Sequence, residues 1–235
     1  MGWYRTKNER LTQILNSSGT ISAVPPDPSP TTKGERTRKV LLDAAIDRFS
    51  RDGYRGTSVA EIARDARLSG TAVYAYFPNK EALFIAAVDE DAAAVIEEGL
   101  TSLTADLDVH RWRQTLIFTL VAAVGRHALA RRVLAGLEPD FTVRLLSIPA
   151  LEQLHKASSE RIRAQQLAGT VRMDIDPDQT ANGLVTIVLS LLMSLIQTGT
   201  DPAALLGPDV AAVIEAALRP PASVTGARRR QQVAR

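Results

Sequence analysis

The sequence contains no cysteine and no long apolar run, and each absence excludes a class of protein. Without cysteine, its 235 residues have no disulfide framework, no thiolate zinc site and no thiol nucleophile. The longest apolar stretch, Leu184 to Ile196, spans 13 residues, whereas a membrane-spanning helix needs about 20. Residues 1–20 carry several charged side chains and no apolar run, unlike a secretory leader. We therefore expect a soluble, cytoplasmic protein that does not enter a membrane.

Motifs typical of enzymes are also missing. The sequence has no nucleophile elbow, no phosphate-binding loop and no histidine spacing typical of a metal site. The three histidines, His110, His127 and His155, share no motif. We expect no catalytic residue, no metal and no cofactor, and the alternative is an all-helical enzyme that lacks a cofactor motif.

Charge is unevenly distributed, although the net charge is only +2. Residues 33–82 carry a net charge of +3 and residues 219–235 carry +5, whereas residues 83–218 carry −7. The acidic middle would be repelled by a polyanion. A nucleic acid would therefore be met by the N-terminal region, with the basic tail adding non-specific affinity or having no role.

Residues 34–82 contain the start and stop signals of three short helices and the start of a fourth. Apolar side chains at three- and four-residue spacing predict a helix over residues 34–51, and Gly53 ends it. Ser58 and Glu61 have the spacing of a capping box, which starts a second helix. Ser69 is a good N-cap for a third helix over residues 70–76, which must end before Pro78.

Helices this short are marginal in water, so they need a packing surface. The first helix supplies it, and the third stays exposed, with a size that fits the major groove of DNA. In this three-helix unit, the apolar side chains of the first helix are predicted to pack against those of the second and third. The predicted pairs place Leu42, Ile46 and Phe49 against Ile62, Val73 and Phe77.

The stretch LLDAAIDRFSRDGYRGTSVAEIARDARLSGTAVYAYFPNKEALF resembles the DNA-binding domain of TetR-family regulators, including its closing Y-x-Y-F-x-x-K-E-x-L element. The resemblance implies contacts to phosphate at the start of the second helix, contacts to base edges from the third, and further phosphate contacts beyond it. The first phosphate contacts would come from Thr57 and Ser58, and the base contacts from Gly70, Thr71 and Tyr74. The further phosphate contacts would come from Tyr76 and Lys80. Core packing is the alternative for Tyr74 and Tyr76.

Two residues depart from the family pattern. Many relatives carry Gly where Arg67 stands and a long polar residue where Gly70 stands. The turn geometry at Arg67 is therefore unusual, and a phosphate contact from Arg67 would replace the base contact that Gly70 cannot make.

Beyond Phe84 the sequence predicts helices only, over residues 79–103, 109–127, 128–136, 139–168, 177–198 and 202–218. The expected fold is all-α, with an N-terminal three-helix helix-turn-helix DNA-binding domain and a helical ligand-binding and dimerisation domain. The expected divisions are a largely disordered extension (1–33), the DNA-binding domain (34–82), the helical effector-binding and dimerisation domain (83–218) and a basic disordered tail (219–235). The extension is either a floppy terminus or an arm that contacts DNA or a partner subunit.

By the same resemblance, the last two long helices pair with those of a second chain in a four-helix bundle. Small or polar side chains recur every four positions from Asn182 to Thr198, which would let another helix come close. A solvent-facing edge and the polar wall of a ligand cavity are the alternatives. The candidates for the dimer interface are Thr186, Ser190, Ser194, Val210, Val213, Ile214 and Ala217.

The resemblance also implies a small-molecule pocket within the helical domain, which is mostly apolar with a few placed polar groups. The candidate lining residues are Trp112, Leu116, Phe118, Arg126, Phe141, Arg144 and Leu145, and core packing is the alternative for each aromatic. An inward-facing Arg126 or Arg144 would favour an acidic or acyl ligand.

The resemblance therefore predicts a homodimeric, ligand-responsive repressor that leaves a palindromic double-stranded DNA operator when a small-molecule effector binds. A constitutive DNA-binding protein or a scaffold protein without an effector is the alternative.

Overall fold

The computed structural model describes residues 33–101, 119–141, 146–199 and 208–221. Within these ranges all the regular elements are helices, so the all-α fold is confirmed. Residues 119–126 are also helical. The labelled elements are α2 (Lys33–Gly56), α3 (Val59–Asp65), α4 (Gly70–Tyr74), α5 (Lys80–Thr101), α7 (Ala128–Leu134), the 3-10 turn η1 (Pro139–Phe141), α9 (Pro149–Leu167), α10 (Pro177–Thr198) and α12 (Pro208–Leu218).

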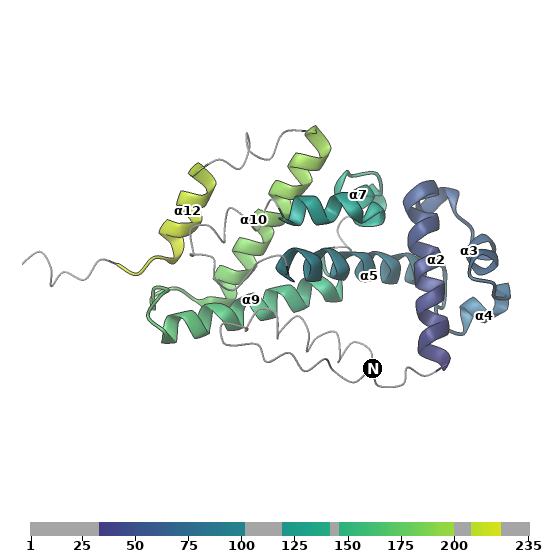
Figure 1. The fold of residues 1–235 in the computed structure, drawn as a ribbon, viewed down its shortest axis with the longest axis horizontal. Helices are drawn as coiled ribbons and strands as arrows, with labels where there is room; N and C mark the ends of the chain where they lie inside the picture. Colours follow the sequence, from purple (N-terminus) through teal and green to yellow (C-terminus); the bar gives the residue numbers. More distant parts are fainter. Residues whose placement is uncertain (1–32, 102–118, 142–145, 200–207, 222–235) are drawn as a thin grey trace, which may run out of the picture.

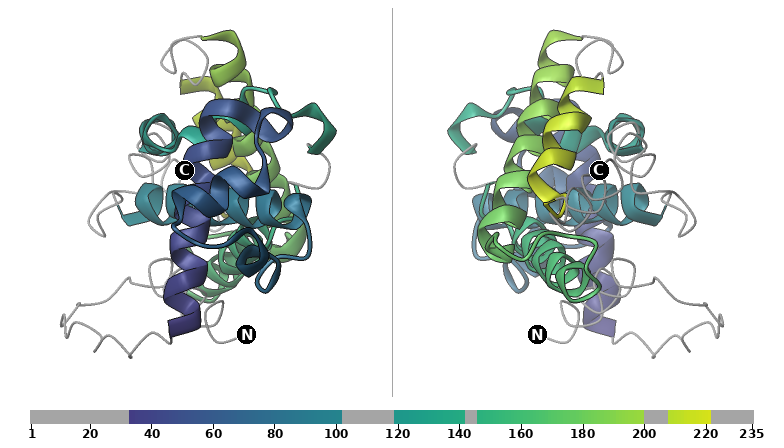
Figure 2. Two further views of the ribbon diagram at one scale, coloured as in Figure 1. Left: turned by 90° about the vertical axis from the view of Figure 1, so that its right-hand side faces the viewer. Right: turned by 90° about the vertical axis from the view of Figure 1, so that its left-hand side faces the viewer.

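The helices form two parts, a head of α2, α3 and α4 and a body of α5, α7, α9, α10 and α12 (Figure 1). The long helix α5 leads from the head into the body, where it packs against α7 and α9. Helices α10 and α12 lie on the side of the body away from the head (Figure 2, right). The head therefore projects from one end of the molecule.

Local signals set the ends of the helices in the head. Gly53 has a φ of 73° and a ψ of 173°, which interrupts the helical backbone of α2 as predicted. The capping box of Ser58 and Glu61 starts α3, and the Ser69 side chain caps α4 by accepting from the backbone N–H of Ala72. Helix α4 ends at Tyr74, two residues before the predicted end, because a turn follows ahead of Pro78.

The predicted packing of the head is confirmed. The three helices of the head bury apolar side chains against one another, and only Ile46 of the predicted set is partly exposed. The same cluster continues into the body through Phe84 and Phe141. Head and body therefore share one hydrophobic core. The predicted members of the cluster are Leu42, Ile46, Phe49, Ile62, Val73 and Phe77.

The predicted helix over residues 139–168 is wrong at its start. Pro139 to Phe141 form only a 3-10 turn, and α9 begins at Pro149. Ile148 is extended, with a φ of −69° and a ψ of 148°, because the proline ring that follows it disfavours helical backbone. Proline itself suits the first turn of a helix, since it has no N–H to leave unpaired.

The prediction for residues 177–198 is confirmed. The Asp176 carboxylate caps α10 by accepting from the Gln179 N–H at 2.8 Å, and Gly199 ends the helix with a φ of 64°. The last helix is described from Pro208, so its predicted start at Pro202 lies outside the described residues. The extension, the tail and residues 102–118 lie outside them as well.

Candidate nucleic-acid interface

Helix α4 lies at the surface of the head and is held from one side. Val73 is buried beneath it, whereas Gly70, Thr71 and Tyr74 are exposed. Tyr74 is 56% exposed, which is unusual for so large an apolar ring. The exposed side chains of α4 are therefore available to a partner, and core packing does not account for Tyr74.

The first turn of α4 is rigid, and the space above it is open. Ser69 Oγ accepts from the Ala72 N–H at 3.2 Å and lies 3.1 Å from Thr71 Oγ1. A Cβ atom added to Gly70 would meet no atom within 4 Å. Neither backbone strain nor crowding thus requires glycine at position 70, so a side chain there would project away from the head.

Ser58 and Thr57 differ in what they can offer to a phosphate. Ser58 is exposed, but its N–H and its hydroxyl both donate to Glu61 Oε2, at 3.0 and 2.8 Å. A phosphate at Ser58 would have to compete with the capping box. These two donors hold the pKa of Glu61 below its ordinary value.

The prediction of a phosphate contact from the Thr57 side chain is wrong for this structure. Thr57 is only 3% exposed, and its hydroxyl donates to the Gly53 carbonyl at 2.7 Å. The hydroxyl thus closes the break in α2 and does not face solvent. The capping-box spacing identifies Ser58 but does not show that its neighbour Thr57 is buried.

Arg67 is exposed and has left-handed backbone, with a φ of 57°. Such a conformation costs a non-glycine residue about 1–2 kcal/mol. A glycine at this position would avoid that cost, because it adopts left-handed backbone freely.

Tyr76 and Lys80 flank the end of α4, and both are half-buried. Tyr76 packs against the core of the head. The Lys80 ammonium lies 4.4 Å from the centre of the Tyr54 ring. Burial lowers the pKa of Lys80, and the nearby carboxylates of Glu138 and Glu61 oppose that shift.

Arg48 links α2 to α3 through ion pairs that the sequence did not predict. Its guanidinium lies 2.7 Å from Asp65, 3.4 Å from Asp52 and 3.8 Å from Glu61. These carboxylates hold the pKa of Arg48 above its ordinary value, with the hydrogen bond to Asp65 first. Arg48 and Asp65 are 17 residues apart, so no short motif could pair them.

Two of the effector-pocket candidates, Arg126 and Phe141, lie in the described residues, and both contact other parts of the chain. The Arg126 side chain is 55% exposed and pairs with Glu98 at 2.6 Å. The prediction for Phe141 is wrong, because its ring packs between head and body, 4.4 Å from Tyr54 and 4.8 Å from Phe84. The other candidates, Trp112, Leu116, Phe118, Arg144 and Leu145, lie outside the described residues.

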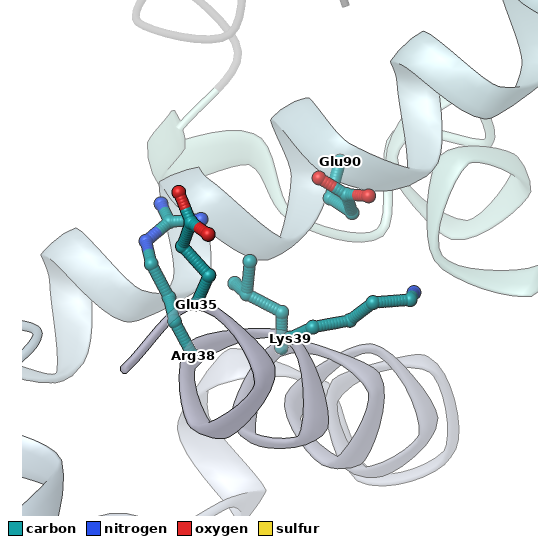
Figure 3. Close-up of a pocket in the computed structure, with 5 residues that line it drawn as sticks. Glu35, Arg38, Lys39 and Glu90 are labelled. Carbon is teal, nitrogen blue, oxygen red and sulfur yellow. The ribbon is translucent and has the colours of Figure 1, made fainter. Parts of the chain in front are cut away.

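A small hollow lies between the N-terminal half of α2 and the facing turn of α5 (Figure 3). Glu35 and Arg38 lie side by side on α2, and Glu90 faces them from α5. The hollow holds little more than a water molecule, so it offers no room for an effector. Among the described residues, no group of histidine and carboxylate side chains is placed to hold a metal ion.

The outer face of α10 is polar but satisfied by its own helix. The hydroxyls of Thr186, Ser190 and Thr198 each donate to the carbonyl four residues earlier, at 2.7–2.8 Å. They thus need no other partner. Helix α10 is also apolar enough to cross a membrane by length and composition, with a mean hydropathy of 1.6 and only 17% of that stretch buried. A single chain therefore covers this helix only in part.

The remaining dimer-interface candidates are also close to the surface. Val213 is 69% exposed and Ala217 is exposed, whereas Ser194, Val210 and Ile214 are half-buried. Ile214 packs on the cluster between α9, α10 and α12. The described part of α12 thus presents apolar side chains both to the body and to solvent.

The head matches a known family. The family model for bacterial regulatory proteins of the tetR family matches residues 41–87. The chain belongs to the TetR family. Its relatives include proteins named as HTH-type transcriptional regulators.

Similarity to TetR-family proteins extends over both head and body. The HTH-type transcriptional repressor Rv1474c of Mycobacterium tuberculosis is 29% identical over 173 residues, which are 70% of this chain and 84% of the relative. The crystal structure of a TetR-family regulator from Mesorhizobium loti covers 80% of this chain and 99% of its own, with a TM-score of 0.62 and 24% identity.

A second solved structure, Thermus thermophilus FadR, is a TetR-family repressor in complex with lauroyl-CoA. It covers 80% of this chain and 98% of its own, with a TM-score of 0.58 and 22% identity. At this level of identity, both structures establish the fold of the body and not its ligand.

Proposed function

We propose that this TetR-family chain is a repressor that binds a palindromic operator as a homodimer and leaves it when a small-molecule effector binds. One observation carries the DNA-binding part. Helix α4 buries Val73 and turns Thr71 and the 56%-exposed Tyr74 outward, on the most projecting part of the head. A short exposed helix of this kind fits the major groove.

The proposed interface follows from what each side chain offers. Thr71 and Tyr74 reach base edges, and the open space above Gly70 leaves room for the duplex to approach closely. Tyr76, Lys80 and Arg67 contact phosphate, since phosphate contacts need donors and positive charge. Ser58 contacts phosphate only if its hydrogen bonds to Glu61 break. Thr57 is not part of the proposed interface.

A second copy of the chain is the proposed cover for α10 and α12. Helix α10 is only partly covered by its own chain and exposes Ile187, and a two-fold dimer would bury this face. The hydroxyls along α10 are satisfied internally, so close approach of another helix leaves no polar group stranded. A dimer would also place two α4 helices on two half-sites of one operator.

The proposed division places the DNA-binding domain at residues 34–82 and the effector-binding and dimerisation domain at residues 83–218. The effector is a small molecule held in the body, and its action on DNA requires that it bind the two states of the protein unequally. Lauroyl-CoA, the ligand of Thermus thermophilus FadR, is the first probe, and the cytoplasm is the proposed location. A constitutive DNA-binding protein is the second candidate, and it predicts that no small molecule releases DNA.

Selection of bound duplexes from a random pool, followed by titration of the selected duplex at several salt concentrations, tests the proposal. Tyr74→Ala is expected to weaken binding to the selected sequence at least tenfold while leaving non-specific binding nearly unchanged, because base contacts supply specificity. Lys80→Ala is expected to weaken binding to all sequences and to reduce the salt slope by about 1 per head.

Arg51→Ala is the matched control, because it removes an exposed positive charge from α2, where Arg51 pairs with Asp47. Equal loss of affinity in Arg51→Ala and Lys80→Ala would mean that net charge alone drives binding. A wild-type chain that prefers no sequence from the pool would overturn the proposed function.

A further inference from the structure

Glu138 is a buried carboxylate of the body that reaches the head. It is 7% exposed, and its Oε1 accepts from the Tyr54 backbone N–H at 3.1 Å and from Arg132 Nε at 2.7 Å. A buried carboxylate is costly unless it is paired and hydrogen-bonded. Glu138 meets both conditions by joining α7, η1 and the end of α2.

The backbone of the head is shaped to receive this contact. Gly53, with its φ of 73°, precedes Tyr54 and turns the Tyr54 N–H toward Glu138. A Cβ atom at position 53 would lie 2.9 Å from Glu138 Oε1 and closer still to the Arg132 guanidinium. Only glycine thus satisfies both the left-handed backbone and the close approach of the Arg132–Glu138 pair.

The side chain of Tyr54 carries the contact onward to the DNA-facing end of α5. Its ring packs 4.4 Å from Phe141 and 5.2 Å from Phe84, and Lys80 Nζ lies 4.4 Å from its centre. A cation over an aromatic ring is held by the negative face of the ring. The Glu138 carboxylate also raises the pKa of Lys80 against the effect of burial, so the two groups are electrostatically linked.

We propose that Glu138 is a positioning residue for DNA binding, which fixes Tyr54 from the body so that the Tyr54 ring holds Lys80 where the duplex phosphate arrives. This inference rests on the proposed function. It gives the body a direct route to a phosphate contact of the head. Any movement of α7 or η1 that displaces Glu138 would release Lys80.

A neighbouring ion pair provides a matched comparison. Arg55 and Asp140 join the same two segments at 2.6 Å, but their side chains are 84% and 58% exposed. Exposed pairs contribute little, because water and salt screen them. The two links thus cross the same boundary, and only that of Glu138 is buried and continues to Lys80.

A double-mutant cycle on the full-length chain tests the inference. Operator affinity and its salt dependence are measured for wild type, Glu138→Ala, Lys80→Ala and the double variant, at a temperature where circular dichroism shows all four to be folded. Glu138→Ala is expected to lose about tenfold in affinity and about 1 in salt slope per head. In the Lys80→Ala background it is expected to lose nothing further.

Three further variants sharpen the result. Glu138→Gln keeps an acceptor for the Tyr54 N–H and is expected to stay within about threefold of wild type. Asp140→Ala is expected to stay within about twofold. If Glu138→Ala does not fold, Tyr54→Leu replaces it, since it removes the ring and leaves the backbone contact, with the same expected loss and the same absence of further loss with Lys80→Ala.

Two results would overturn the inference while leaving the proposed function intact. One is an equal loss from Glu138→Ala, or from Tyr54→Leu in its place, in the wild-type and Lys80→Ala backgrounds. The other is wild-type affinity of Lys80→Ala for the operator. A wild-type chain without any sequence preference would instead overturn the proposed function, and the inference with it.

Discussion

At the scale of single residues, two left-handed turn positions of the head have been filled differently. At position 53, where φ is 73°, the residue is glycine, which suits the close contact with Arg132 and Glu138. At position 67, where φ is 57°, the residue is an exposed arginine. The backbone strain at Arg67 is tolerated, and it comes with a positively charged side chain between α3 and α4.

Replacing Arg67 by glycine should therefore stabilise the fold and weaken DNA binding. Relief of the left-handed backbone, less the greater freedom of glycine in the unfolded chain, should give about 0.5–1 kcal/mol. This corresponds to roughly 1–4 °C in the midpoint of thermal unfolding. Binding to all duplexes should fall, with a smaller salt slope.

Calorimetry and salt-controlled titration measure the two effects separately. Arg67→Asn is the control, because asparagine tolerates left-handed backbone and lacks the charge. Lower stability in Arg67→Gly would contradict the assignment of strain, and an unchanged salt slope in both variants would remove Arg67 from the interface.

At the scale of elements, α3 depends on a capping box that titrates. The Ser58 hydroxyl, and then its backbone N–H, donate to Glu61 and hold the pKa of Glu61 below its ordinary value. A carboxyl whose pKa is lowered in the folded state stabilises that state fully above its ordinary pKa. This contribution is lost as the pH falls through the lower, folded-state pKa.

Glu61→Gln should accordingly lower the thermal midpoint at neutral pH and have little effect in acid. Since the ordinary glutamate pKa is about 4.3, the difference between wild type and variant should shrink as the pH falls from about 5 to about 3. Thermal unfolding followed by circular dichroism across this range measures it. A difference that stays constant with pH would mean that the charge of Glu61 does not contribute.

At the scale of the whole molecule, the chain has a long helix that one copy covers only in part. Helix α10 lies beside α12 on the side away from the head (Figure 2, right). Its exposed stripe includes Asn182, Thr186 and Ser190. A large charged group in that stripe should prevent close approach of another helix, with little effect on a surface that remains in water.

Ser190→Arg should therefore convert the proposed dimer into single chains of 25.4 kDa, as measured by light scattering at micromolar concentration. Operator affinity should fall strongly, because one head reads only one half-site. Asp43→Arg, at an exposed position of α2, is the control and should leave the mass unchanged. A dimeric Ser190→Arg variant, or a monomeric wild type, would contradict the proposed interface.

Much of the head could be predicted from its sequence, because the signals that set it act over three or four residues. The capping box of Ser58 and Glu61, the N-cap Ser69, the glycine stop at Gly53 and the proline after α4 each specify a helix end without reference to distant parts of the chain. Thr57 and Phe141 could not be placed in this way. Phe141 is buried against Tyr54, which only the folded chain brings near it, and Thr57 is buried with its hydroxyl turned back to the Gly53 carbonyl.

The sequence by itself determined the all-α class and the helix-turn-helix, since periodicity and capping are local properties of the chain. Only the tertiary structure decided how the head is held. Glu138 and the Tyr54 N–H are 84 residues apart, and no spacing rule relates them. A buried hydrogen bond between distant segments depends on the packing of every helix between them, which is why it becomes visible only in three dimensions.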